Sequence, residues 1–425
     1  MSITTEQTSN TLLQPQSVSK ARKLYTAGLY LYAATCHFSI SASQISLGLA
    51  LIGFIIELYH GRIRVTGTSV DKPFAFLCFA CFLSVFRANN PLQALTDLKT
   101  FLLILCFYLP FWYKPEQSQQ KRLLTTFIVS TGIAATVVFY KHMFIFESGT
   151  RAKGFFSSPM TFGECQAMAL LVIVSAIAFV KQTRHYLLLS AAAVFSCCAI
   201  VFSMVRGAWL ALITGLIYIV AKKPAKVAPV CAIMALAVSG LFIGDINIRE
   251  RLDGLNPAST ISTGKIRIGE EQPGVSLSAN YQRLLNWHRG FEMIKDRYAF
   301  GIGMNNVYDW YEKLCTDYEK EKKWVFGHMH NNFLQFLITA GPLGLIAFLW
   351  FFYELFLFVF CQTKPPENTI SWLCEFGGRS ILICYFVTGF FEYSFGDQEV
   401  TMMAFFLTGT CAAGRTTYNQ ALGQI

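Results

Sequence analysis

Residues 327–360 read GHMHNNFLQFLITAGPLGLIAFLWFFYELFLFVF, a polar segment that ends at His330 and runs directly into a long apolar one. From Asn331 to Phe360 the only charged residue is Glu354. A bilayer core takes about 20 helical residues, so this stretch predicts a membrane-spanning helix. His330 is then predicted at the boundary between membrane and water, and a chemically active histidine there would place any reaction at that boundary.

The whole chain has the composition of a polytopic membrane protein. Of its 425 residues, 54% are hydrophobic and 14% are charged, with a mean hydropathy of +0.43, whereas soluble domains are about a quarter charged. The net charge of +10 comes from Lys and Arg clustered in short loops, where such residues orient membrane helices, so nucleic acid is not an expected partner. Thirteen scattered cysteines, mostly inside apolar runs, indicate no disulfide framework.

Twelve apolar runs predict membrane-spanning helices, and membrane lipids are therefore expected partners. The runs lie near 24–42, 43–59, 73–88, 97–113, 123–146, 163–180, 186–203, 207–221, 226–243, 331–360, 379–393 and 400–413. The predicted organisation is an N-terminal tail, nine spans, a large loop, three spans and a C-terminal tail, at 1–23, 24–243, 244–330, 331–413 and 414–425. The fold class that follows is an all-α polytopic membrane protein.

The loop charges orient these spans. Lys20, Arg22 and Lys23 end an N-terminal tail without an evident cleavable signal peptide, so this tail is predicted to be cytoplasmic. Twelve spans then put the even-numbered gaps and the C-terminal tail in the cytoplasm. Each of these gaps is basic, through Arg62, Arg64, Lys72, Lys114, Lys121, Arg122, Lys181, Arg184, Lys222, Lys223, Lys226, Lys364 and Arg379. The loop at 244–330 is consequently predicted on the outer side.

This large loop contains NYQRLLNWHRGFEMIKDR at residues 280–297, which predicts an amphipathic helix. Leu284, Trp287, Phe291 and Ile294 recur every three or four residues. We expect the helix to lie over the outer face of the membrane.

His330 is the first candidate for chemistry. Asn331 and Asn332 are natural N-cap residues for the apolar helix that follows. The positive end of the helix dipole disfavours imidazolium, so a neutral ring that can accept a proton is expected. The alternative is a histidine that only caps or anchors the helix at the interface. His328 cannot share a helical face with His330 and is a secondary candidate.

Arginines on the outer side are the next candidates. Arg206, in SMVRGAWL, interrupts two apolar runs where the positive-inside rule gives no reason for a cation, so it is expected to have a partner or to be an interfacial anchor. Arg283 and Trp287 share a helical face, and a guanidinium suits phosphate. Arg289 could join such an anion site, although a solvated helix face is its preferred interpretation, and Arg151 lies in a second outer loop.

The acidic residues Glu392, Asp397 and Glu399 lie near the last outer loop. They could orient an arginine or a hydroxyl, but an ordinary polar loop is the preferred interpretation. No carboxylate pair has metal-ligand character, and the chain contains no glycine-rich nucleotide loop. Neither a metal nor another cofactor is therefore expected.

One motif resembles a known signature. His330-Asn331, nine residues, Gly341, two residues and Gly344 resemble the His-(Asn/Ser/Gln)-x9-Gly-x-x-(Gly/Thr/Tyr) pattern of the O-antigen ligase family. This family of membrane glycosyltransferases also includes O-antigen polymerases and pilin O-oligosaccharyltransferases.

Two further segments carry the same resemblance. SMVRGAWL is similar to the family's Ser-x-x-Arg-Gly segment and carries its arginine onto Arg206. YQRLLNWHRGFEMIKDRYAFGIGMNN is similar to the segment with an arginine, a tryptophan and a Phe-Gly-x-Gly turn, which places the second arginine on Arg283 and the turn at 300–303. Ala299 stands where the family commonly has proline, a difference that touches no chemistry.

The resemblance implies a GT-C-like fold and a reaction at the periplasmic face of a Gram-negative inner membrane. The donor would be an O-antigen glycan on undecaprenyl diphosphate, and the ligase branch uses a sugar hydroxyl of lipid A-core as acceptor. Arg206 and Arg283 would neutralise the diphosphate, and His330 would either take the proton of the attacking hydroxyl or bind the diphosphate as imidazolium. The reaction would invert the anomeric carbon without metal or ATP. Substrate binding would also involve Asn331, His328, Arg289 and Arg151.

Other functions are open within and outside this family. The signature does not separate ligases from polymerases or pilin transferases, but a single large loop of under 90 residues and no extra soluble C-terminal domain favour a ligase. A polysaccharide or lipid transporter is the alternative from another class. A transporter should place ionisable residues near the bilayer midplane, whereas the predicted spans put charges at their ends and in the outer loops.

Overall fold

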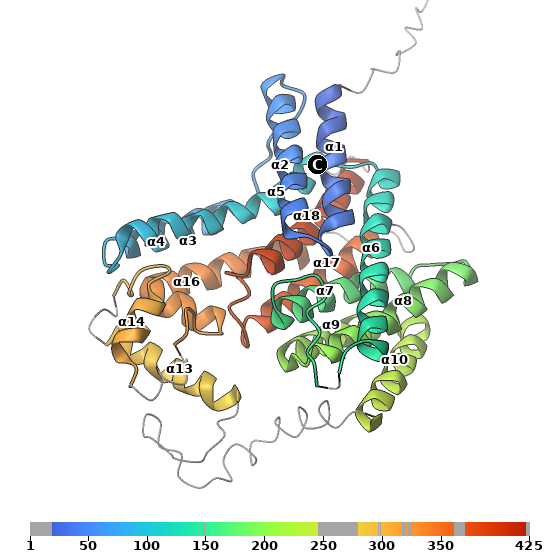
Figure 1. Cartoon of the computed structure of the whole chain (residues 1–425). Helices are drawn as coiled ribbons and strands as arrows, with labels where there is room; N and C mark the ends of the chain where they lie inside the picture. The colour runs from blue at the N-terminus through green and yellow to red at the C-terminus, as the bar shows by residue number, and fades with distance from the viewer. Residues whose placement is uncertain are drawn as a thin grey trace, which may run out of the picture.

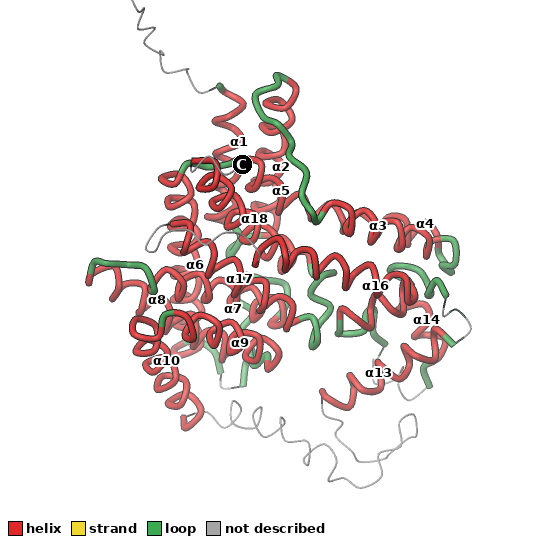
Figure 2. The backbone as a smooth tube through the Cα atoms, turned by 180° about the vertical axis from the view of Figure 1, so that it is seen from behind, coloured by secondary structure: helices red, strands yellow, loops and turns green. Residues whose placement is uncertain are grey.

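The computed structural model describes residues 19–147, 149–244, 279–295, 297, 299–316, 320, 325–360 and 370–421, and its regular elements in these ranges are helices (Figures 1 and 2). Residues 245–278 of the predicted large loop lie outside the described ranges. The helices are α1 (Lys20–Thr35), α2 (Ile40–Tyr59), α3 (Asp71–Val85), α4 (Pro91–Asp97), η1 (Leu98–Ile104), α5 (Leu105–Tyr113), α6 (Gln117–Phe144), α7 (Pro159–Ile177), α8 (Thr183–Phe202), α9 (Arg206–Lys222), α10 (Pro224–Gly244), α13 (Ala279–Ile294), α14 (Val307–Leu314), α16 (Asn332–Phe360), α17 (Ile370–Thr388) and α18 (Gln398–Ala421).

Within the described ranges, seven helical stretches are long and apolar enough to cross a membrane. They are α2, the continuous stretch from α4 to α5, α6, α7, α8, α10 and α16. The chain is therefore a polytopic α-helical membrane protein, as its composition predicts. The first predicted boundary is misplaced, because α1 already ends at Thr35 and Ser39 caps α2 by accepting a hydrogen bond from the Ala42 amide at 3.3 Å.

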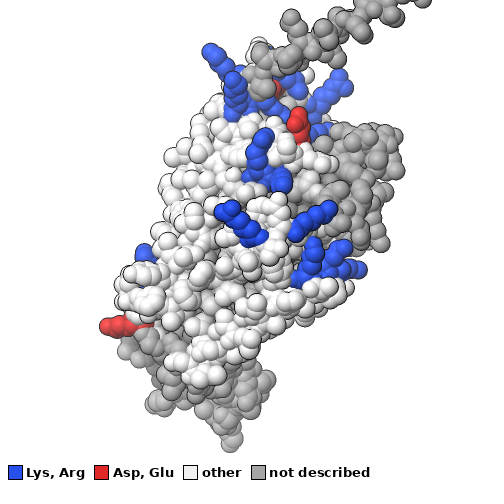
Figure 3. All heavy atoms as spheres, turned by 90° about the vertical axis from the view of Figure 1, so that its right-hand side faces the viewer, with Lys and Arg blue, Asp and Glu red and all other residues white. Residues whose placement is uncertain are grey.

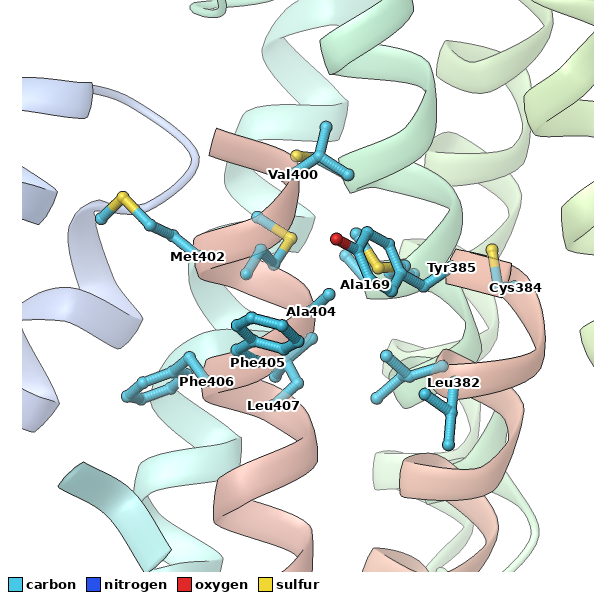
Figure 4. Packing of buried hydrophobic residues seen from close by; sticks show 14 of the residues in the cluster. Ala169, Leu382, Cys384, Tyr385, Val400, Met402, Ala404, Phe405, Phe406 and Leu407 are labelled. Atoms are coloured by element: carbon cyan, nitrogen blue, oxygen red, sulfur yellow. The ribbon is translucent and has the colours of Figure 1, made fainter. Parts of the chain in front are cut away.

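The centre of the bundle is formed by α7, which packs against α8, α9 and α17, and by α18, which packs against α17 and α5. Figure 4 shows Ala169 of α7, Tyr385 of α17 and Phe405 of α18 in this core, and each of them is buried. Helix-on-helix burial of this kind fixes where α9 begins and where α17 ends. Those two ends lie at the candidate site.

α16 is broken in its first half, and the break has a chemical cause. Gly341 adopts φ 70° and ψ −171°, a region that is essentially restricted to glycine. Pro342 has no amide hydrogen, so the Ile338 carbonyl loses its helical donor. The amide of Ile302 donates to that carbonyl instead, at 2.9 Å. The Gly303 amide donates likewise to the Thr339 carbonyl at 2.9 Å.

The described part of the large loop packs on this broken end of α16, as Figures 1 and 2 show for α13 and α14. Met293, Ile302, Tyr311 and Ile338 belong to its own small hydrophobic core. α13 begins and ends within one to three residues of the predicted amphipathic helix.

The apolar residues predicted on one face of α13 are divided in the structure. Leu284 is 45% exposed and Phe291 is 51% exposed, whereas the packed face carries Leu285 and Met293. The helix is therefore present where the sequence predicts it, but the periodic residues do not form its buried face.

Arg379 does not lie in a connection between helices, because α17 already begins at Ile370. It lies inside α17 and pairs with Glu375 at 2.5 Å. Its guanidinium also donates to the Val359 and Phe360 carbonyls at 3.4 and 2.8 Å. A guanidinium can satisfy the last carbonyls of a neighbouring helix, so Arg379 lies level with the end of α16.

Candidate active site at the start of helix α16

The segment before α16 has an irregular backbone that presents its two histidines. His330 has a φ of 48°, in the left-handed region that non-glycine residues rarely adopt. α13 fixes this conformation, because Asn286 Nδ2 donates to the His328 carbonyl at 2.9 Å and Trp287 Nε1 donates to the Met329 carbonyl at 2.8 Å. A backbone strained in this way persists where its surroundings determine it, and it is typical of functional sites.

Asn331 performs the helix-capping role that the sequence predicts. Its Oδ1 accepts a hydrogen bond from the Leu334 amide at 2.9 Å. Its Nδ2 donates to the Phe390 carbonyl at 3.0 Å. The Asn332 amide donates to the Gly389 carbonyl at 2.7 Å. These bonds hold the turn between α17 and α18 against the histidine segment, although the two are far apart in sequence.

Glu392 lies in that turn and meets the sequence-predicted residues. Its Oε1 accepts a hydrogen bond from His330 Nδ1 at 2.6 Å, and its Oε2 is 3.6 Å from Arg283 Nη2. The nearest carboxylate oxygen is 3.7 Å from His328 Nδ1. The Glu392 side chain is only 12% exposed, so these charged and polar groups interact with little screening by water.

The protonation state of Glu392 follows from its surroundings. Burial by itself would raise the pKa of this carboxyl, but the hydrogen bond from His330 and the charges of the histidines and Arg283 together hold it below its usual range. Glu392 is therefore ionised at neutral pH. A carboxylate can only accept, so His330 Nδ1 carries a proton and Nε2 is the nitrogen left to accept one.

His328 belongs to the same cluster, which the sequence analysis did not anticipate. Its ring centroid is 4.2 Å from that of His330, because the segment is irregular and the argument about helical faces does not apply. Burial, together with the neighbouring charge of His330, lowers the pKa of His328 to about 4. His328 is consequently neutral at pH 7 and can exchange hydrogen bonds without carrying charge.

Arg206 is the first residue of α9 and is half-buried. Its neighbour Gly207 touches the same turn that carries Glu392, since a Cβ at Gly207 would lie 2.8 Å from Phe391 Cβ. The chain enters α9 through Met204, whose φ is 55°. Arg151 supports this entry, because its Nε donates to the Ser203 carbonyl at 3.0 Å.

Arg289 and the acidic residues Asp397 and Glu399 have local roles. Arg289 is 9% exposed and pairs with Glu292 at 2.8 Å, so it does not lie on a solvated face. Asp397 accepts hydrogen bonds from Thr161 Oγ1 at 2.6 Å and from the Glu399 amide at 3.1 Å, at the first turn of α18. Asp397 and Glu392 both match the open alternative, because Asp397 holds the Thr161 hydroxyl and Glu392 faces the Arg283 guanidinium.

Sequence reasoning named Glu392 but preferred a polar loop for it and predicted no contact with His330. The available signal was an acidic residue at the end of an apolar span on the same predicted side as His330. The predicted span 379–393 would have continued the helix through this position. In the structure α17 ends at Thr388, and Glu392 lies in the turn beyond it.

A family model described as O-Antigen ligase matches residues 191–349. The matched region runs from α8 into α16 and includes Arg206, Arg283 and His330, but it stops before Glu392. A comparison with curated proteins finds no match to the chain.

The family assignment and the helices together identify a membrane enzyme of the O-antigen ligase or polymerase type. The structure explains why glycine stands at two positions of the family signature. Gly341 allows the break in α16, and a Cβ at Gly344 would lie 2.3 Å from Ala340 Cβ. Glycines 301 and 303 of the Phe-Gly-x-Gly turn have φ values of 72° and 93° and contact the broken helix and Ala88.

Proposed function

We propose that this protein is an O-antigen ligase, an inverting glycosyltransferase of the Gram-negative inner membrane. It transfers the glycan from undecaprenyl diphosphate to a sugar hydroxyl of lipid A-core at the periplasmic face. The observation that carries the proposal is the contact of His330 Nδ1 with Glu392 Oε1 at 2.6 Å beside Arg283, in a segment that matches the family.

His330 acts as the general base in this proposal. Glu392 holds the proton on Nδ1 and stabilises the imidazolium that forms, so Nε2 can take the proton of the acceptor hydroxyl. The hydroxyl oxygen forms a bond with the anomeric carbon while the bond from that carbon to the diphosphate oxygen breaks. Undecaprenyl diphosphate leaves with the electron pair. The glycosyl diphosphate supplies the driving force, so the proposed reaction uses no ATP.

Arg206 and Arg283 supply the positive charge for the leaving diphosphate. Negative charge on its oxygens grows as the glycosidic bond breaks, and guanidinium groups aimed at this charge lower the barrier. The 3.6 Å separation between Arg283 and Glu392 is longer than a hydrogen bond, so Arg283 can turn toward a phosphate without losing a close contact. In this reading the two arginines take the place of a metal ion.

The remaining predicted binding residues are assigned by their contacts. His328 offers a neutral hydrogen-bonding ring beside His330. Asn331, Arg151 and Arg289 act on the substrates through the segments that they hold: the α16 cap, the entry to α9 and the packed face of α13.

The proposed topology has twelve spans, a GT-C-like arrangement and both termini in the cytoplasm. The face drawn in Figure 3 bears on the orientation alone, because Lys and Arg gather on it and Asp and Glu are few there. Such a face is typical of the cytoplasmic side of a membrane protein. The Arg379 guanidinium donates to the Val359 and Phe360 carbonyls, so this ion pair lies level with the end of α16.

The decisive experiment is reconstitution in proteoliposomes with undecaprenyl-diphosphate glycan and purified lipid A-core, without ATP or added metal. We expect glycan on lipid A-core with the wild-type chain and none with Arg206→Ala, Arg283→Ala or His330→Ala. Glycan lengthening on the donor would instead identify a polymerase. Transfer to a pilin Ser or Thr would identify a pilin transferase, and movement of intact donor across the bilayer without transfer would identify a transporter.

A further inference from the structure

His328, His330 and Glu392 have a geometry that the transfer reaction does not require. One ligand atom from each residue lies within 4.8 Å of the other two. We propose that these three side chains form a binding site for a divalent transition-metal ion such as Zn²⁺, and that the bound ion inhibits the enzyme. The binding site stands independently of the proposed function, and the inhibition rests on it.

The distances are close to those of a metal site. Zinc binds imidazole nitrogen at about 2.0–2.1 Å and carboxylate oxygen at about 2.0–2.2 Å, so two ligands of a tetrahedral ion lie about 3.4 Å apart. Glu392 Oε1 is 2.6 Å from His330 Nδ1 and 3.7 Å from His328 Nδ1. These two separations lie on either side of the tetrahedral value. An ion would replace the proton shared by His330 and Glu392, and small side-chain rotations would complete the site.

The charges of the three groups also suit a cation. Glu392 supplies a carboxylate that is only 12% exposed, and among the described residues no group donates a hydrogen bond to its Oε2. Two imidazoles and a carboxylate are a ligand set that zinc and similar ions prefer.

The backbone around the ligands is already fixed. Asn286 holds the His328 carbonyl and Trp287 holds the Met329 carbonyl, so little ordering is needed when the ion binds. All three side chains retain some exposure, which gives an ion a path from water. Arg283 opposes the ion, since its guanidinium is 3.6 Å from Glu392 Oε2. This nearby positive charge predicts a weaker affinity than that of a structural zinc site.

Inhibition follows from the atom that the ion would occupy. On His330 the ion takes Nδ1, so the ring proton moves to Nε2 and the hydrogen bond to Glu392 is lost. A protonated Nε2 cannot accept the proton of the acceptor hydroxyl. The proposed ion therefore competes with catalysis without contacting the substrate.

The test is metal binding by the full-length, untagged chain in detergent after removal of metal with a chelator. Isothermal titration with Zn²⁺ at pH 7.5 should show one ion per chain, and Co²⁺ should give the visible absorption of a four-coordinate site. His328→Ala and Glu392→Gln should each weaken binding at least 10-fold, and Arg283→Gln should strengthen it. The matched control is His288→Ala, which removes an exposed histidine 3.7 Å from Glu292 and should leave the titration unchanged.

The outcomes separate the site from its effect. Unaltered Zn²⁺ affinity in both His328→Ala and Glu392→Gln, or no binding at all by the wild-type chain, overturns the site. A second titration follows transfer to lipid A-core as Zn²⁺ is added, and activity should fall with the same midpoint as binding. Binding at these residues with undiminished transfer overturns the inhibition and with it the role of His330 as base, while the metal site stands.

Discussion

The middle of α17 and the turn beyond its end carry similar residues but use them differently. In the middle of the helix Glu375 pairs with Arg379, whose guanidinium also meets two carbonyls at the end of α16 and the Tyr218 hydroxyl. Beyond the end of the helix, Glu392 faces Arg283 across 3.6 Å and holds His330 at 2.6 Å.

The two groups differ in how many of their polar atoms have hydrogen-bond partners. Each nitrogen of the Arg379 guanidinium has a partner inside the chain, so this charge joins α16, α17 and α9. At the outer end Arg283 keeps only a long contact, Glu392 Oε2 has no hydrogen bond among the described residues, and His330 Nε2 is directed away from the carboxylate. Incompletely satisfied charge at an irregular segment is the signature of a site that binds something else.

The largest effect is expected for His330→Ala. Loss of a general base typically costs about 10²–10⁴-fold in rate, and reconstituted transfer to lipid A-core measures it. The control is His288→Ala, at an exposed residue of α13, which should retain wild-type transfer. Near-normal transfer by His330→Ala would show that His330 is not the general base. The Glu392 turn would then differ from the Arg379 pair in structure but not in function.

In the middle of α17, Arg379→Met should lower the stability of the folded chain and leave the rate of transfer unchanged. It leaves the buried Glu375, 2% exposed, without its cation, and breaking a buried pair costs about 3–5 kcal/mol. Thermal unfolding in detergent should show the loss, whereas transfer per folded molecule stays unchanged. The double variant Arg379→Met/Glu375→Leu removes both charges and should regain most of the stability. A loss of transfer per folded molecule would mean that the pair of Arg379 and Glu375 also takes part in the reaction.

Glu392→Gln tests whether the carboxylate positions His330. We expect transfer to fall more than about 10-fold but less than in His330→Ala, because the amide keeps the shape and loses the charge that stabilises the imidazolium. The loss should fall on kcat, with KM for lipid A-core nearly unchanged, because the carboxylate acts through His330 and does not bind the acceptor. A loss of thermal stability without this change in kcat would indicate that Glu392 serves only the local fold. Its counterpart Glu375→Gln should leave kcat unchanged.

Gly341→Ala tests the break that separates the outer part of α16 from the rest. Its φ of 70° and ψ of −171° are essentially restricted to glycine, and an alanine there should cost about 1–3 kcal/mol of stability. Gly48→Ala in α2 is the control, because a Cβ at Gly48 meets no atom within 4 Å; it should be neutral or slightly stabilising. Equal effects at the two glycines would contradict the conformational argument.

The smallest effect is expected for His328→Gln on the pH dependence of stability. The pKa of His328 is lowered from near 6.5 to about 4 in the folded chain. As pH falls through this window the unfolded chain takes up the proton first, so the wild-type protein loses stability between pH 6.5 and 4. The variant should lose less. Thermal midpoints at pH 7 and pH 5 measure the difference, and His288→Gln, at an exposed histidine, should follow the wild type.

Several features could be predicted from the sequence because they depend on local chemistry. Asn331 was predicted as an N-cap and is one, because a short amide side chain after a polar segment has few better roles at the start of an apolar helix. The helix containing Arg283 and Trp287 was predicted from its periodicity, and both residues contact the histidine segment or its carboxylate partner. α17 begins at Ile370, earlier than the predicted span, because hydropathy alone does not register that Arg379 is paired with Glu375 inside the helix.

The helical membrane class and the region that matches the family could be predicted from the sequence alone, which also made His330, Arg206 and Arg283 candidates, because spacing, apolarity and motifs are local properties of the chain. The contact of Glu392 with His330 and the place of His328 beside them became visible only in the folded chain. The contact joins turns 62 positions apart. It depends on the end of α17, the irregular segment before α16 and the packing of α13, and no local pattern encodes how three such elements converge.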